Sequence, residues 1–424
     1  MAFSLCVFAN ISFAISLQEE IKDVDMDIFL RYRYTGTRMR NQDFGASHLK
    51  RNSTVSSHAW RANADFKSPN LEGIELNLGI VYNNSSIQAD RSNVYPNVGR
   101  GLGAGEDSAF GVSTFFATLH LEAMSTVVHL GKMRLDTPLN DTLDDRGTGI
   151  YAFNSDIPHW TFKGGAFDTW SLGDLGKDYS SFNAPSGSNS ITNELATVGA
   201  RADYDNFSAQ LWYFRAGGLI DHALFAELAY ENELFALKGQ SVLSSLDKKG
   251  ELLNGVPSGN LLYTLEAQAR VADQKTKLKV GYIGSGEEGY RVSLDDQASF
   301  NMGGKIWNDH SIAEVNYSIY GAFPRAQNRL DSLKLSVFYV GVDHEVEEGL
   351  YAGIDYVRGE NKKALYTINF QEITPMITYK YNKNVDFLAY YAMLKAENTG
   401  LKKSLTTYKD AHQSRFRFQA TYHF

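Results

Sequence analysis

The chain has a single cysteine in 424 residues, Cys6, and it lies in an apolar N-terminal stretch. A mature chain without this stretch has no thiol, so it forms neither a disulfide nor a thiolate metal site. Such a composition suits an oxidising compartment, where a stray thiol is a liability. The scarcity of cysteine therefore favours an exported protein.

Long hydrophobic runs are also missing. Beyond the N-terminus no stretch of about 18 apolar residues occurs, which excludes membrane-spanning helices. A transmembrane β-barrel passes this test, because only every second residue of its strands faces lipid. The same alternation explains how a membrane protein can have a mean hydropathy of −0.31.

Positive charge is in deficit, with 41 Lys and Arg against 49 Asp and Glu, a net charge of −8. This balance argues against a nucleic-acid partner. Proline is scarce (8), whereas Gly (36), Tyr (24) and Phe (25) are frequent. The profile is typical of a strand-rich, turn-rich chain with aromatic residues for interfacial girdles.

Residues 1–14 resemble the apolar core of a signal peptide that ends in the small-x-small pattern Ser12-Phe13-Ala14. They contain no Lys or Arg, so the basic start of the signal is missing and the N-terminus is expected to be truncated or mis-assigned. We predict cleavage after Ala14, which leaves a single domain over 15–424. A buried first strand is the alternative.

The last residues of the chain alternate in polarity with the period of two that a β-strand has. One face carries Phe416, Phe418, Ala420, Tyr422 and Phe424, and the other carries Arg415, Arg417, Gln419, Thr421 and His423. Such a strand suits a boundary between lipid and a watery lumen. A strand of a soluble sandwich is the alternative, but a terminal Phe is typical of bacterial outer-membrane barrels.

Similar alternation recurs along the whole chain, for example over 24–34, 60–67, 198–204, 261–271 and 373–381, with no break in composition that would mark a second domain. Short polar turns and long polar stretches separate the segments, as at the two rims of an outer-membrane barrel. Tilted strands of about 9–11 residues predict a transmembrane antiparallel barrel of about 16–18 strands. A barrel of this size is too wide to be filled by its wall and encloses an aqueous channel.

Several segments resemble the Campylobacter-type major outer membrane porin family. The most specific is the block Leu17–Tyr34, and shorter patches are 210–212, 234–239, 379–382 and the terminal strand. The resemblance implies a homotrimer in the bacterial outer membrane, reached through the periplasm and surrounded by lipid and lipopolysaccharide. It implies a general-diffusion channel for ions and small hydrophilic solutes, with no catalysis.

The family places an inward constriction loop after a strand like 129–135, which corresponds here to about 136–159. Its first ten residues contain four carboxylates, Asp136, Asp141, Asp144 and Asp145, and the stretch has too little apolar surface to form a core. In a narrow aqueous pore these charges attract cations and repel anions, so weak cation selectivity is expected. A solvated external loop is the alternative.

Basic residues in the lumen phase of the strands are expected to form the opposite wall of the channel. The set is Arg31, Arg33, Arg61, Lys132, Arg134 and Arg201. Lys132 and Arg134 are two residues apart and are therefore predicted to share a face. For these two, a position outside the narrowest zone is an equal alternative.

Alignment with the family also brings Asp144, Asp178 and Asp295 close to acidic positions that could meet in the lumen. Calcium takes six to eight oxygen ligands, often from separate loops, so a calcium site is a hypothesis and solvated acids are the alternative. No cofactor is required for passive diffusion. Two other classes stay open: an adhesin, whose long loops bind host surfaces, and a barrel enzyme such as a protease or phospholipase. The ten histidines are scattered and none lies in a recognisable nucleophile motif.

Overall fold

The computed structural model describes residues 24–40, 52–89, 110–171, 194–247, 258–271, 274–294, 299–309, 311–318, 332–364, 366–399 and 410–424. In this part of the chain, eighteen antiparallel strands and a 3₁₀ turn, η1 (Glu122–Met124), are assigned. The predicted signal peptide, 1–14, lies outside the described residues. No helix among them is long and apolar enough to cross a membrane.

The strands are β1 (Asp25–Arg40), β2 (Asn52–Lys67), β3 (Ile74–Ala89), β4 (Phe110–Leu121), β5 (Thr126–Arg134), β6 (Arg146–Asn154), β7 (Trp160–Ser171), β8 (Leu195–Tyr204), β9 (Phe207–Ala216), β10 (Ile220–Glu231), β11 (Phe235–Leu246), β12 (Gly259–Val271), β13 (Thr276–Ser285), β14 (Ser332–Glu347), β15 (Leu350–Lys363), β16 (Thr367–Lys380), β17 (Val385–Thr399) and β18 (Asp410–His423).

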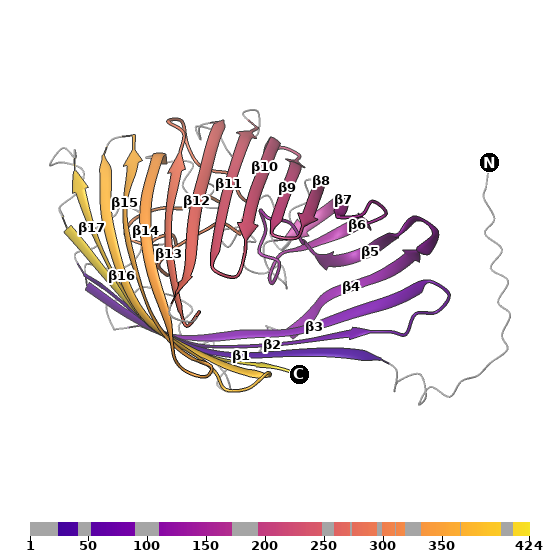
Figure 1. The fold of residues 1–424 in the computed structure, drawn as a ribbon, viewed down its shortest axis with the longest axis horizontal. Helices are drawn as coiled ribbons and strands as arrows, with labels where there is room; N and C mark the ends of the chain where they lie inside the picture. Colours follow the sequence, from indigo (N-terminus) through magenta and orange to yellow (C-terminus); the bar gives the residue numbers. More distant parts are fainter. Residues whose placement is uncertain are drawn as a thin grey trace.

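The sheet closes on itself. Each strand pairs with its neighbours in sequence, and β1 also pairs with β18, from Phe29 opposite His423 to Arg40 opposite His412 (Figure 1). Ile28 and Phe424 exchange backbone hydrogen bonds of 3.1 and 2.9 Å, so the last residue of the chain takes part in the seam. Closure gives every one of these eighteen strands a partner on both sides. The predicted all-β antiparallel barrel of about 16–18 strands is confirmed.

Alternation places apolar side chains on the outside. On β12, Tyr263 and Leu265 are 39% and 53% exposed, whereas Leu262, Thr264 and Glu266 between and beside them are buried. Terminal strand β18 follows the same rule: Phe416 and Tyr422 are exposed, and Gln413, Arg415 and Thr421 are buried. The exposed apolar band is the surface expected to meet lipid.

The two rims differ in the length of their connections. At the rim where β1 begins and β18 ends, two residues join β8 to β9, and two residues join β14 to β15. At the other rim, twenty residues separate Ala89 of β3 from Phe110 of β4. This asymmetry assigns the short turns to the periplasmic side and the long connections to the outside.

Two connections from the outer rim fold into the barrel. One joins β5 to β6 over 135–145, and the other joins β13 to β14 and is described over 286–294, 299–309 and 311–318. The thin trace of the second lies inside the ring of strands in Figure 1. The inward segment after β5 is shorter than the predicted 136–159, because residues 146–154 form wall strand β6.

The direction of the side chains can be tested with two arginine substitutions on β12. Leu265→Arg places a charge in the middle of the lipid-facing band and should destabilise the folded barrel by about 2–4 kcal/mol. Gln268→Arg, in the lumen phase of the same strand, should have a much smaller effect. The measurement is equilibrium folding into lipid vesicles, and equal costs for both variants would contradict the assignment of faces.

Candidate functional site

The two inward segments meet inside the barrel. The backbone N–H of Leu294 donates to the carbonyl of Leu139 at 3.0 Å, and that of Ser299 donates to Pro138 at 3.2 Å. Leu139 and Leu294 are fully buried in one apolar cluster, which includes Phe300. These contacts join the two inward segments into one unit that divides the lumen. We call this unit the partition.

The partition is anchored to the wall by a buried carboxylate, Glu372 of β16. Its oxygens accept hydrogen bonds from the backbone N–H groups of Lys305, Ile306 and Trp307 at 2.6, 3.1 and 2.8 Å, and from the hydroxyl of Thr374 at 2.6 Å. Hydrogen bonds to a charged acceptor are stronger than those between neutral groups. Three of them hold the turn at 305–307 against the wall, and the fourth, from Thr374 of the same strand, orients the carboxylate.

A second carboxylate holds the preceding residue. Asp355 of β15 accepts from the backbone N–H of Gly304 at 2.9 Å and from the ammonium of Lys279 at 3.0 Å. Gly304 has a φ of +77°, which favours glycine over any residue with a side chain. The indole of Trp307 stacks on Phe370 of β16 with ring centroids 5.7 Å apart. Polar and apolar contacts therefore fasten the same turn.

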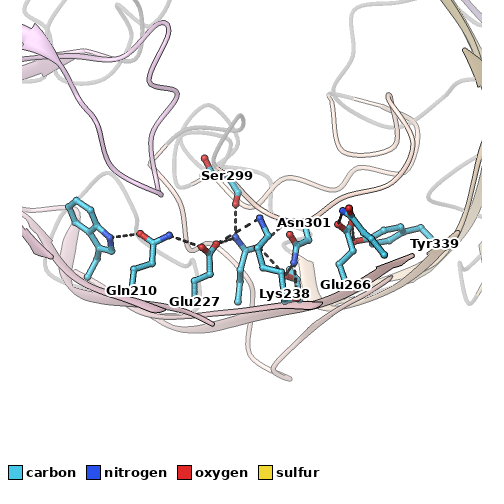
Figure 2. A network of polar contacts seen from close by, with 11 residues as sticks. Gln210, Glu227, Lys238, Glu266, Ser299, Asn301 and Tyr339 are labelled. Carbon is cyan, nitrogen blue, oxygen red and sulfur yellow. Dashed lines mark hydrogen bonds and ion pairs between the residues drawn. The ribbon is translucent and has the colours of Figure 1, made fainter. Parts of the chain in front are cut away.

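A row of polar side chains on the inner wall fastens the residues before that turn (Figure 2). Glu227 of β10 accepts from Gln210 of β9 at 2.8 Å and from Gln240 of β11 at 2.6 Å. Gln240 also donates to the carbonyl of Ser299 at 2.7 Å and accepts from the backbone N–H of Asn301 at 2.8 Å. The side-chain amide of Gln240 thus forms hydrogen bonds with the wall and with the inward segment. Buried polar groups on both sides thereby gain the hydrogen-bond partners that they require.

The segment after β5 is organised around Asp145. Its carboxylate is fully buried and accepts from the side chain of Asn140 at 2.8 Å and the backbone N–H of Asp141 at 3.1 Å. Burial raises the pKa of Asp145 above its ordinary value. A carboxyl group in this environment holds the turn together and contributes little charge to the lumen.

Asp144, the preceding residue, reaches the wall at β2, three strands away from β5. It forms an ion pair with Arg61 of β2, whose side chain is only 1% exposed, whereas that of Asp144 is 35% exposed. Arg61 also donates to the carbonyl of Leu143 at 3.1 Å and to Asn63 at 3.0 Å. The structure thus brings together one predicted acid and one predicted base from positions 83 residues apart.

Five arginines line this part of the wall, and we call them the arginine wall: Arg31, Arg33, Arg61, Arg415 and Arg417. They come from three adjacent strands, β18, β1 and β2. Arg33 donates twice to Gln419, at 3.1 and 2.9 Å, and Arg417 lies 5.6 Å from the ring centroid of Tyr390. Arg415 forms an ion pair with Asp309 of the second inward segment.

Arg415 and Arg417 are absent from the predicted basic wall. The alternation of β18 places both on the polar face, which is the signal that identifies them. The closure of β18 onto β1 places them on the strand next to Arg31 and Arg33. In the register, Arg33 lies opposite Gln419, which is closer to the periplasmic rim than Arg415 and Arg417 are. That these arginines are neighbours follows from the pairing of β18 with β1 and cannot be read from the sequence.

The other predicted bases lie elsewhere. Arg134, at the end of β5 where the chain turns inward, pairs with Asp65 at 2.6 Å. Arg201 of β8 pairs with Asp203 on its own strand at 2.8 Å.

Lys132 departs from the predicted lumen wall. It is in register with Phe115, which is 60% exposed, and its ammonium donates to the carbonyl of Val112 at 2.8 Å. Cross-strand partners share a face, so Lys132 lies on the outside of the barrel. Lys132 and Arg134 therefore do not share a wall, because the regular alternation of β5 ends where the chain enters the lumen.

The two remaining predicted acids differ in surroundings. Asp136 is half-exposed and pairs with Lys163 of β7 at 2.6 Å. Asp141 is partly buried, accepts from the backbone N–H of Leu143 at 2.8 Å, and has a pKa raised by burial and by the neighbouring charge of Asp144. Of the four predicted acids, Asp141 and Asp144 face the arginine wall.

The hypothetical calcium ligands cannot be assembled from the described residues. Asp178 and Asp295 lie outside these residues, and the carboxylate of Asp144 forms an ion pair with Arg61. Within the described ranges no group of three His, Cys, Asp or Glu side chains is placed to hold a metal ion. Calcium binding stays a prediction from the sequence.

A family model described as Campylobacter major outer membrane protein matches residues 1–424. No curated protein matches the chain.

Solved structures with the same architecture include OpdQ of Pseudomonas aeruginosa, with a TM-score of 0.62 at 14% identity over 95% of this chain and 99% of that one. OpdK of the same organism, solved with vanillate, has a TM-score of 0.60 at 14% identity over 95% and 99%. OccAB4 of Acinetobacter baumannii has 0.59 at 13% over 94% and 98%. At these identities the likeness concerns the fold.

The anchoring role of Glu372 can be tested by Glu372→Ala. The change removes the acceptor of three backbone N–H groups, each such bond to a charged group contributing about 1.5–3 kcal/mol, and should release the 305–307 turn. We expect larger and noisier single-channel conductance in planar bilayers.

Glu360→Ala is the control, because Glu360 is an exposed residue on the outer face of adjacent strand β15 and its substitution removes the same charge. Quiet, wild-type conductance from Glu372→Ala would show that the segment is held without this carboxylate.

Proposed function

Because the chain belongs to the Campylobacter major outer membrane protein family and is an outer-membrane porin, we propose that its lumen is a passive general-diffusion channel with a weak preference for cations. The permeant species are ions and small hydrophilic solutes. The observation that carries the proposal is that the inward segment at 135–145 lies inside the barrel and contacts the arginine wall at Arg61, so that it narrows the lumen.

The charges at this narrowing are arranged on opposite sides. Asp141 and Asp144 lie on the inward segment, and Arg31, Arg33 and Arg417 lie on the wall with partly exposed side chains. Opposed charges create a field across the pore that orders water and polar solutes. An apolar solute would lose that ordered solvation without replacement, which favours hydrophilic cargo.

Two facts support a weak preference for cations, one for its sign and one for its weakness. The chain carries a net charge of −8, which favours counter-cations around the pore. Near the narrowing, however, Asp136 and Asp144 are paired with Lys163 and Arg61, and Asp145 is buried. Pairing cancels most of the local negative field, so the ratio of cation to anion permeability should be modest.

The arginine wall supports a second candidate, a path for solutes that carry a carboxylate. Guanidinium groups bind carboxylates through paired hydrogen bonds. Arg31, Arg33 and Arg417 of the arginine wall are partly exposed, and OpdK, of similar fold, was solved with vanillate. Benzoate added to one side of a bilayer would reduce the potassium current if this candidate is right, and would leave it unchanged in an Arg31→Gln/Arg33→Gln variant.

We further propose that the channel is a homotrimer without catalytic activity, as its family resemblance implies. Conductance that appears in groups of three equal steps would support this assembly. A silent bilayer together with hydrolysis of peptide or phospholipid would favour the enzyme, and binding to host cells by a silent protein would favour the adhesin.

The acids at the narrowing are tested by Asp141→Asn/Asp144→Asn. Removal of two carboxylates that face the arginine wall should shift the reversal potential in a potassium chloride gradient towards anions. Asp145→Asn is the matched control, since this carboxyl group is buried and its turn can be kept by an amide. A shift of equal size in the control would remove Asp141 and Asp144 from the selectivity zone.

The bases are tested by Arg31→Gln/Arg33→Gln, which should shift the reversal potential in the opposite direction, towards cations. Arg201→Gln is the control, because Arg201 is paired with Asp203 on β8, away from the arginine wall. If the two variants behave alike, the wall does not determine selectivity.

A further inference from the structure

The outer surface of the barrel seam carries a row of basic side chains. Arg40 of β1 lies directly opposite His412 of β18, and His412 lies directly opposite Lys395 of β17. Arg38, two residues from Arg40, is on the same face. We call Arg38, Arg40, Lys395 and His412 the basic row.

The basic row faces away from the lumen. On β18, His412 is exposed whereas its neighbours Ala411 and Gln413 are buried. On β17, Lys395 alternates with buried Leu394 and Ala396. The row therefore continues the outward phase of the strands and has no access to the channel.

Apolar side chains lie beside the row, towards the middle of the strands. Ile373, Tyr391 and Met393 are about two-fifths exposed, and together with the basic row they line a groove of about 440 Å³. Phe416, opposite Tyr391, extends the apolar surface below the groove. The surface thus passes from cationic to apolar along the direction of the strands.

The position along the strands assigns the basic row to the outer leaflet. Arg40 ends β1, and His412 is the third residue of β18, both at the rim opposite the short turns and the C-terminus. That rim faces the outside of the cell in an outer-membrane barrel. Lipid at this level is the outer leaflet, where lipopolysaccharide presents phosphate groups above its acyl chains.

We propose that the basic row binds a phosphate group of lipopolysaccharide, while its acyl chains lie on Ile373, Tyr391, Met393 and Phe416. Adjacent strands are about 4.8 Å apart and alternate residues about 6.8 Å apart, so the four side chains can converge on one phosphate. Arginine suits this ligand, because its guanidinium donates paired hydrogen bonds to phosphate oxygens. The proposal depends on the orientation of the barrel and not on what the channel conducts.

The acidic neighbours do not cancel the row. Glu397 forms an ion pair with Lys395, and Asp410 lies opposite Glu397, one step further towards the outer rim. The Lys395–Glu397 pair is exposed, and exposed pairs are weak enough to exchange for a phosphate. Arg38 and Arg40 lie two strands away from Glu397, the partner of Lys395, so they are the residues to change.

Binding is tested with Arg38→Gln/Arg40→Gln in the purified full-length protein. The probe is deep-rough lipopolysaccharide in detergent, with native mass spectrometry to count bound molecules and a dephosphorylated preparation for comparison. The control is Lys380→Gln/Lys383→Gln, which removes two exposed positive charges at the periplasmic rim. Heat-modifiability on gels shows whether each variant is folded.

We expect the variant to bind lipopolysaccharide at least tenfold more weakly than the wild type, the control to stay within twofold, and the wild type to discriminate against the dephosphorylated lipid. The proposal is overturned if the variant binds like the wild type, if the control loses as much, or if phosphate makes no difference. Loss of oligomers with unchanged lipid binding would instead assign this face to contact between copies. Single-channel conductance of the variant should equal that of the wild type, so the result is independent of the channel's function.

Discussion

Lipid offers no hydrogen-bond partner to a backbone N–H or carbonyl group, and this constraint determines the architecture of the protein. A sheet meets it only by closing, because an open edge would leave a row of such groups unpaired. Here closure depends on the pairing of β1 with β18, which extends to backbone bonds between Ile28 and Phe424. The outward apolar band and the inward polar wall both result from this closed sheet.

A barrel of eighteen strands leaves a lumen that its own wall cannot fill. The chain narrows it with two connections from the outer rim, which bury apolar side chains against the wall and against each other. Their backbone groups also need partners, and wall carboxylates supply them. Glu372 and Asp355 accept hydrogen bonds from four consecutive residues, 304–307, so charge in the wall acts as a structural anchor as well as a lining of the pore.

The chemistry of the narrow part of the lumen depends on the closed seam and on the two inward segments. The seam gathers arginines from three strands, and the inward segments bring Asp144 and Asp309 to Arg61 and Arg415. Some of the acidic charge is thereby neutralised and some, at Asp141, is left partly exposed. The narrowest part of the lumen is thus lined by polar groups and by charges of both signs. The outer face of the seam separates charge differently, with the basic row above an apolar band.

The sequence alone determined the features that alternation produces: an all-β closed barrel, its outward and inward faces, the approximate number of strands, and the polar face of β18. These are local properties, since the direction of each side chain depends on its neighbours in the chain. The resemblance to the family also implied that the stretch after β5 enters the lumen, but not that residues 146–154 return to the wall, or that Asp145 is buried while Asp144 pairs with Arg61.

Tertiary structure alone decided the remaining features. The β13–β14 connection shows no period in its sequence, and its buried position depends on distant partners such as Glu372 and Gln240. Lys132 was misplaced because alternation gives the relative phase of residues but not where a strand ends and the chain turns inward. The arginine wall could not be assembled from the sequence, because residues almost four hundred positions apart become neighbours only when β18 closes onto β1.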